Sequence, residues 1–177
     1  MKPNRLVLPA VALVSLLAGL ALFKLIEPGS TSASAPGNTD IELHSIPLDD
    51  LDGRQTRVSD WDDNVLVVNF WAPWCAPCRR EIPALLEIQR EFAARGVRIL
   101  GIAFDGAEQV RRFVTEYGID YPIFLAGSRS AMYNAAFDNP SGSLPFTALL
   151  DGERRIVYRH NGELTAQQLR EQLEALL

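Results

Sequence analysis

The sequence predicts an α/β fold with a mixed central sheet, and three observations support this. Two apolar runs rich in β-branched residues, Val65–Trp71 and Val97–Phe104, are typical of strands buried on both faces. Segments of helical periodicity follow both runs, so strand and helix alternate as in parallel βαβ units. Near the C-terminus, Asp151-Gly152 joins two strand-like segments, which predicts an antiparallel hairpin in the same sheet.

The first 26 residues are predicted to deliver the rest of the chain out of the cytoplasm. Lys2 and Arg5 precede Leu6–Phe23, an apolar run without charge, which suits a membrane anchor or a signal peptide. The small-residue sequence at 33–35 lies well beyond that run, so we favour an uncleaved anchor with its N-terminus in the cytoplasm. A signal peptide that is removed is the alternative.

Residues 27–40 and 41–177 form the remaining two parts of the predicted organisation. Residues 27–40 have no periodicity and many small polar residues, which indicates a flexible tether. Residues 41–177 are enough for one domain with a substantial core. The net charge of −5 argues against a nucleic-acid partner.

The elements of this domain follow from local patterns taken in order. A hairpin is predicted from 46–48 and 54–58 around Asp52-Gly53, and the strand at 65–71 leads into a helix that ends before Gly96. Apolar residues spaced as i, i+3, i+4, i+7 predict a helix that stops at Gly118. Further elements are expected as a strand at 97–104, a strand at 123–125, a short helix at 129–137, strands at 146–150 and 155–160, and a last helix capped by Thr165 and Gln168.

The only two cysteines, Cys75 and Cys78, stand where the central strand passes into its helix. This spacing predicts a redox couple. At the helix N-terminus the unpaired N–H groups and the helix dipole favour a thiolate, so Cys75 is the attacking sulfur and Cys78, one turn deeper, resolves. Pro77 provides no N–H to the thiolate, which favours a less oxidising couple. A zinc site is disfavoured because the two histidines do not stand at ligand spacing.

Glu81 is a candidate proton acceptor on the same helix. Cys78, Glu81 and Leu85 recur in steps of three and four, so periodicity places Glu81 on the core face. Two interpretations stay open. Glu81 either lies buried near the thiols with a raised pKa and takes the proton of Cys78, or it is a first-turn acid that faces water.

The segment Asn69–Cys78, with Arg79–Pro83 after it, resembles the thioredoxin superfamily, and within it the TlpA/ResA-type membrane-anchored disulfide reductases. The resemblance implies a three-layer αβα sandwich with an N-terminal hairpin and an inserted βα unit. It implies that Asn69 occupies the place of a buried aspartate and supports the site together with Pro77, and that Glu81 supplies the carboxylate instead. It also implies that Pro145 is cis beside the cysteines and that Trp74, Leu144 and Pro145 bind the client, with the backbone of Leu144 pairing with an extended segment.

The function that this resemblance implies is reduction of client disulfides outside the cytoplasm. The only redox group would be the Cys75–Cys78 disulfide, with no added cofactor and no metal. The expected partners are client proteins of cytochrome c or copper-site maturation, a membrane electron donor of the DsbD/CcdA type, and the inner membrane, with the domain in the periplasm. The alternatives are a disulfide oxidant or isomerase of the same fold, and a copper-binding thiol module.

Overall fold

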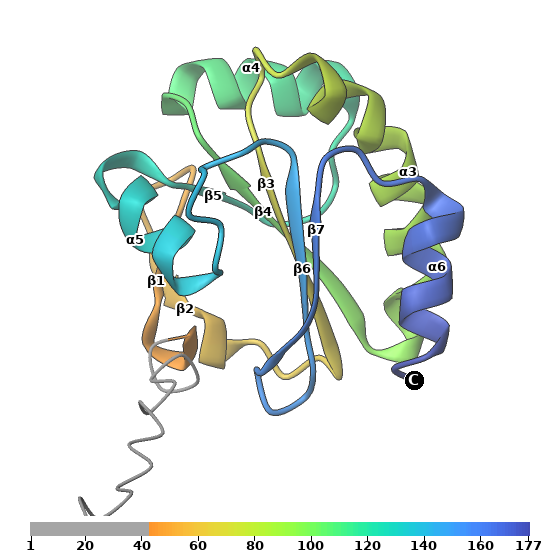
Figure 1. Ribbon diagram of the computed structural model, residues 1–177. Coiled ribbons are helices and arrows are strands. Elements are labelled where there is room, and N and C mark those ends of the chain that lie inside the picture. The colour runs from red at the N-terminus through yellow and green to blue at the C-terminus, as the bar shows by residue number, and fades with distance from the viewer. Residues whose placement is uncertain (1–42) are drawn as a thin grey trace, which may run out of the picture. The chain divides into compact units, whose positions relative to one another are not determined.

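The computed structural model of the protein describes residues 43–177, which form a seven-stranded sheet with helices on both faces (Figure 1). The strands are β1 (Pro47–Asp50), β2 (Gln55–Arg57), β3 (Val65–Trp71), β4 (Val97–Ala103), β5 (Ile123–Leu125), β6 (Phe146–Leu150) and β7 (Ile156–Asn161). The helices are α3 (Ala76–Phe92), α4 (Ala107–Tyr117), α5 (Ser130–Ala136) and α6 (Ala166–Glu174). Short 3-10 turns are η1 (Val58–Asp60), η2 (Ala93–Arg95) and η3 (Gly127–Arg129).

The sheet is mixed, as predicted, with strand order β2-β1-β5-β4-β3-β6-β7. β3, β4 and β5 run parallel, whereas β6 is antiparallel to β3 and the two outer hairpins are antiparallel throughout. The N-terminal hairpin is β1 with β2, and the inserted unit is α4 with β5. The predicted thioredoxin-like architecture is therefore confirmed.

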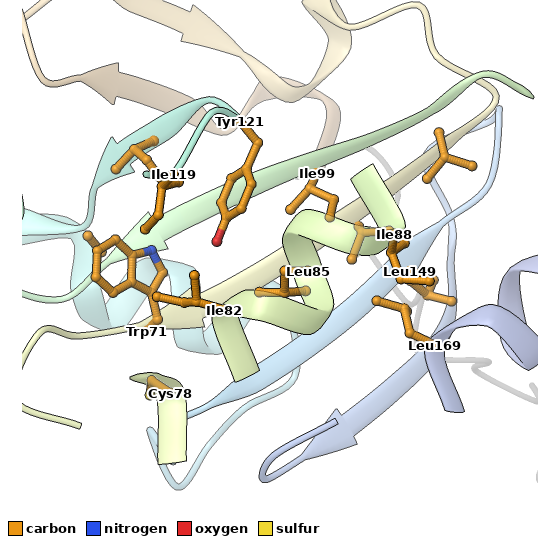
Figure 2. Packing of buried hydrophobic residues seen from close by; sticks show 14 of the residues in the cluster. Trp71, Cys78, Ile82, Leu85, Ile88, Ile99, Ile119, Tyr121, Leu149 and Leu169 are labelled. Atoms are coloured by element: carbon orange, nitrogen blue, oxygen red, sulfur yellow. The ribbon is translucent and has the colours of Figure 1, made fainter. Parts of the chain in front are cut away.

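Alternation along β3 divides the core into two clusters, one on each face of the sheet. Val67 and Trp71 enter the cluster beneath α3, α4 and α6, whereas Val68 and Phe70 enter the cluster beneath α5 and the segment before β1. Figure 2 shows the first cluster, with Cys78 at one end of the row that α3 contributes. The same alternation turns Asn69 toward α3, and this places a polar side chain under the helix that carries the cysteines.

Several element boundaries differ from the sequence prediction by one or two residues, and the differences at β1 and α3 have local reasons. The first hairpin strand continues to Asp50, two residues beyond the predicted end. There the Asp50 carboxylate accepts the Asp52 and Arg54 N–H groups, each at 2.8 Å, and closes the turn around Asp52-Gly53. Helix α3 ends at Phe92 and a 3-10 turn carries the chain to Gly96, which has a positive φ of 81°. Glycine adopts that conformation without a steric cost.

Within residues 43–177, none of the helices combines the length and the apolar composition needed to cross a bilayer. The predicted anchor at 1–26 and the tether at 27–40 lie outside the described residues.

Candidate active site

The two cysteines lie between the carboxyl end of the interior strand β3 and the first turns of α3. They are joined by a disulfide with their Cα atoms 5.3 Å apart. Cys75 is the N-cap of α3, with the extended φ and ψ of −80° and 106° that an N-cap requires. The short loop after Trp71 thus fixes the first sulfur at the start of the helix.

The helix N-terminus provides one backbone donor to the first sulfur. The Cys78 N–H donates to Cys75 Sγ at 3.3 Å, and Pro77, at the second helical position, has no N–H to add. Cys75 is 5% exposed and Cys78 1%. The deeper sulfur is therefore Cys78, in keeping with its predicted position one turn into the helix.

Glu81 lies on the core face of α3, one turn beyond Cys78, and is only 1% exposed. Its Oε1 accepts the Leu164 N–H at 3.2 Å, and its Oε2 accepts a hydrogen from Asn69 Nδ2 at 3.4 Å. Burial raises the pKa of Glu81 to about 7, and these two hydrogen bonds oppose that rise. A carboxyl group with a pKa near neutrality can accept and release a proton at physiological pH. The water-facing interpretation of Glu81 is wrong.

Asn69 connects Glu81 to the neighbouring strand. Its Nδ2 also donates to Thr147 Oγ1 at 3.1 Å, and the two residues face each other in the register of β3 and β6. Both side chains are fully buried. Because an amide nitrogen carries two hydrogens, Asn69 presents its donor side to Glu81 and Thr147 at once. Sequence reasoning identified Asn69 but missed Thr147, whose part depends on strand register.

The segment before α6 also closes over Glu81, and sequence reasoning did not single it out. Leu164 donates the backbone N–H described above, and its neighbour Glu163 forms an exposed ion pair with Arg80 at 2.6 Å. Arg80 thus joins this segment to α3 one residue before Glu81. Only the tertiary fold brings these residues together.

The predicted client-binding residues lie at the end of the sheet from which β3 leads to the disulfide. The Leu144–Pro145 bond is cis, as the resemblance implied, and Pro145 precedes Phe146, which pairs with Phe70 near the end of β3. Leu144 is partly buried against the cluster that contains both cysteines, and Trp74, next to Cys75, is 66% exposed. An exposed indole therefore lies next to Cys75 in the chain, and the loop that ends in Pro145 lies at the same end of the sheet, where β3 leads to the cysteines.

Metal-ligating side chains do not gather elsewhere in the part of the chain that the structure describes. Among residues 43–177 no three His, Cys, Asp or Glu side chains come close enough to hold an ion together.

Comparison with known proteins agrees with this geometry. Residues 31–177 match the Redoxin family. The chain belongs to the Redoxin family. Within this family it is 30% identical to the thiol-disulfide oxidoreductase ResA of Geobacillus thermodenitrificans over 99% of this chain and 98% of the relative. ResA of Bacillus cereus is 27% identical over 99% of both chains.

A solved structure shows the same architecture. A secreted thiol-disulfide isomerase from Corynebacterium glutamicum superposes with a TM-score of 0.68 and 30% identity, over 76% of this chain and 84% of that one. Together with the Cys75–Cys78 pair, these relatives show that this Redoxin-family protein is a ResA/TlpA-type thiol:disulfide oxidoreductase that acts on disulfide-bearing client proteins.

Proposed function

We propose that this oxidoreductase acts as a disulfide reductase, and the observation that carries the proposal is the buried Glu81 one turn beyond Cys78. In the reduced enzyme the Cys75 thiolate attacks one sulfur of a client disulfide. A mixed disulfide forms, and the second client sulfur leaves as a thiolate and takes a proton from solvent. At this stage the client is not yet fully reduced, because one of its sulfurs is still bonded to Cys75.

Glu81 serves the second half of the reaction. Its carboxylate takes the proton of the Cys78 thiol, and the Cys78 thiolate then attacks Cys75 Sγ. The bond between Cys75 and the client breaks as the Cys75–Cys78 disulfide forms. The client sulfur that was bonded to Cys75 leaves as a thiolate and takes up a proton from solvent, while Glu81 releases the proton of Cys78 to solvent, so the client ends with two thiols. An ionised carboxylate near the sulfurs also raises their pKa values, which disfavours the thiolate and makes the couple more reducing.

The cycle needs two electrons and two protons to restore the thiols. The disulfide is the only redox group in this proposal, so the electrons come from a partner dithiol, and a membrane protein of the DsbD/CcdA type fits this role outside the cytoplasm. Residues 1–26 would hold the domain at the inner membrane facing the periplasm, or direct its export and be removed. The proposed clients are the cysteine pairs of cytochrome c or copper-site maturation, since these must be reduced before haem or copper is attached.

Cysteine trapping tests the roles of the two sulfurs. Cys78→Ser should accumulate a mixed disulfide with clients, because attack occurs and the second step cannot. Cys75→Ser should trap nothing. The measurement is non-reducing electrophoresis of cell extracts after acid quenching. If Cys75→Ser were the better trap, the assignment of the attacking sulfur would be reversed.

The similarity to the secreted thiol-disulfide isomerase of Corynebacterium glutamicum supports a second candidate of the same fold, an enzyme that rearranges non-native disulfides. Refolding of a scrambled disulfide protein without added reductant separates the two. An isomerase recovers the native pairing with the catalytic dithiol unchanged, whereas a reductase stops after one equivalent of thiol is consumed.

A further inference from the structure

We infer that Asn139 is a positioning residue for the client site, acting on the peptide unit that precedes Leu144. The inference rests on the proposed function, since it concerns how a client segment is held beside the disulfide. Asn139 lies in the loop between α5 and β6 and is 1% exposed, although it is polar and outside any helix or strand. A buried amide in a loop requires partners for its hydrogens and its oxygen.

The side chain of Asn139 holds residue 143 by both of its backbone groups. Asn139 Nδ2 donates to the Ser143 carbonyl at 3.1 Å, and Asn139 Oδ1 accepts the Ser143 N–H at 3.3 Å. The second hydrogen of Nδ2 goes to Asn134 Oδ1 on α5, at 3.2 Å. The amide of Asn139 therefore links the loop to α5 through Asn134 and holds the backbone of Ser143 within the loop.

Further hydrogen bonds stiffen the same loop. The Asn139 N–H donates to the Asn134 carbonyl at 2.8 Å, and the Gly142 N–H donates to the Asn139 carbonyl at 2.9 Å. Ser143 Oγ lies 2.6 Å from Asn161 Oδ1, which links the loop to the end of β7. Residue 143 is thus fixed from both sides, by α5 through Asn139 and by β7 through its own hydroxyl.

The hydrogen bond from Asn139 Nδ2 to the Ser143 carbonyl fixes the direction of the Leu144 N–H. The carbonyl of Ser143 and the N–H of Leu144 belong to one planar trans peptide unit, in which the two groups point in opposite directions. Because Asn139 holds the carbonyl toward itself, the Leu144 N–H points away from Asn139. Within residues 43–177 that N–H has no backbone acceptor, whereas the carbonyl of Pro145 already accepts the Gly162 N–H at 2.8 Å.

This arrangement selects the class of client that the loop can hold. A disulfide carried in an extended peptide segment can offer a backbone carbonyl to the Leu144 N–H, as in addition of a strand to an exposed edge. A small disulfide without a peptide backbone cannot. Asn139 therefore contributes to the preference for peptide disulfides and not to the reactivity of the sulfurs.

The test compares two disulfides with each variant. The reduced full-length enzyme reacts with an extended peptide that contains an internal disulfide and, separately, with bis(2-hydroxyethyl) disulfide, and second-order rates are measured by thiol release. Asn139→Asp keeps the shape and the acceptor but replaces the donor to the Ser143 carbonyl with an oxygen. We expect its rate with the peptide to fall about tenfold, the loss associated with one backbone hydrogen bond, while its rate with the small disulfide stays within about twofold of the parent.

The control is Ser141→Ala, because Ser141 Oγ touches Asn139 Oδ1 at 3.3 Å but holds no backbone group of residue 143. It should keep the parent ratio of the two rates. If a buried aspartate prevents folding, Asn139→Ala is measured in its place, with thermal unfolding as the check. An unchanged ratio, or an equal loss with both disulfides, overturns the inference for Asn139. A parent enzyme that reduces neither disulfide overturns the proposed function instead.

Discussion

At the scale of single residues, the site depends on how Glu81 is surrounded. Its two carboxylate oxygens face two donors, the Leu164 N–H and Asn69 Nδ2, while burial disfavours its charge. The balance leaves its pKa at about 7, so the group changes protonation across physiological pH. Helical periodicity in the sequence placed Glu81 on the core face but left open a water-facing side chain, and the structure shows it buried. Its two donors come from distant segments, and no local pattern indicates them.

Glu81→Gln should remove the pH dependence of client release. In the parent, Glu81 acts as a base only when ionised, so the rate of mixed-disulfide breakdown should rise with pH through about 7. The glutamine variant should be slower and lack this inflection. Stopped-flow release of client from a preformed mixed disulfide measures it. Glu108→Gln, an exposed glutamate paired with Arg112 on α4, is the matched control and should follow the parent.

Glu81→Gln should also change the pH dependence of stability. Because the pKa of Glu81 is raised in the folded state, the folded protein binds more protons than the unfolded chain between pH 4.5 and about 7. Parent stability should therefore fall as pH rises through this window, by about 2 kcal/mol between pH 5 and pH 8. Glu81→Gln should lack that fall in urea unfolding. An equal pH dependence in variant and parent would mean that Glu81 keeps an ordinary pKa.

At the scale of elements, β3 and α3 position the cysteines and Glu81, and the neighbouring strand β6 contributes Thr147, which accepts a hydrogen bond from Asn69. The apolar run of β3 and the stripe of α3 were predictable, because periods of two and 3.6 residues are local properties. The pairing of Asn69 with Thr147 depends on the register of β6, which lies 78 residues away in sequence. Asn139 likewise forms its hydrogen bonds to the backbone of Ser143 only when the loop folds back. Such contacts are long-range, so one sequence could not indicate them.

A Gly101→Ala variant tests whether the close packing of β4 against Trp71 stabilises the protein. A Cβ added at Gly101 would lie 2.6 Å from Ile123 Cδ1 and 3.0 Å from Trp71 Nε1, in a core without room for it. Gly101→Ala should therefore destabilise the protein by about 1–3 kcal/mol. Chemical denaturation measures this. Gly152→Ala, where the nearest atom would be 3.6 Å away, should cost far less. Equal effects would show that the core beneath Trp71 can adjust.

At the scale of the whole molecule, the strand and helix patterns and the resemblance of the cysteine motif together predicted the architecture, and the Redoxin-family match agrees with it. The central motif, the hairpins and the inserted unit fall where sequence patterns expected them, because each has a local signal. Export of the domain is a proposal that rests on the sequence of residues 1–26. The redox direction is a proposal that rests on the chemistry of the cysteine pair.

Export of the domain can be tested on the full chain. The basic start and the apolar run at 6–23 lead us to expect that a reporter active only outside the cytoplasm, fused after Leu177, is active. The fusion should stay with membranes after alkaline washing. Release into the soluble fraction with loss of the first residues would indicate a removed signal peptide, and an inactive reporter would contradict export.

The central claim is that the Cys75–Cys78 couple donates electrons to clients, and its equilibrium reduction potential tests this most directly. The purified protein is equilibrated with glutathione buffers, and the fraction of dithiol is counted by alkylation and mass spectrometry. Pro77 and the nearby carboxylate of Glu81 both disfavour the thiolate, so we predict a potential close to that of thioredoxin, about −270 mV. A potential close to that of DsbA, about −120 mV, would contradict the claim and make the protein an oxidant.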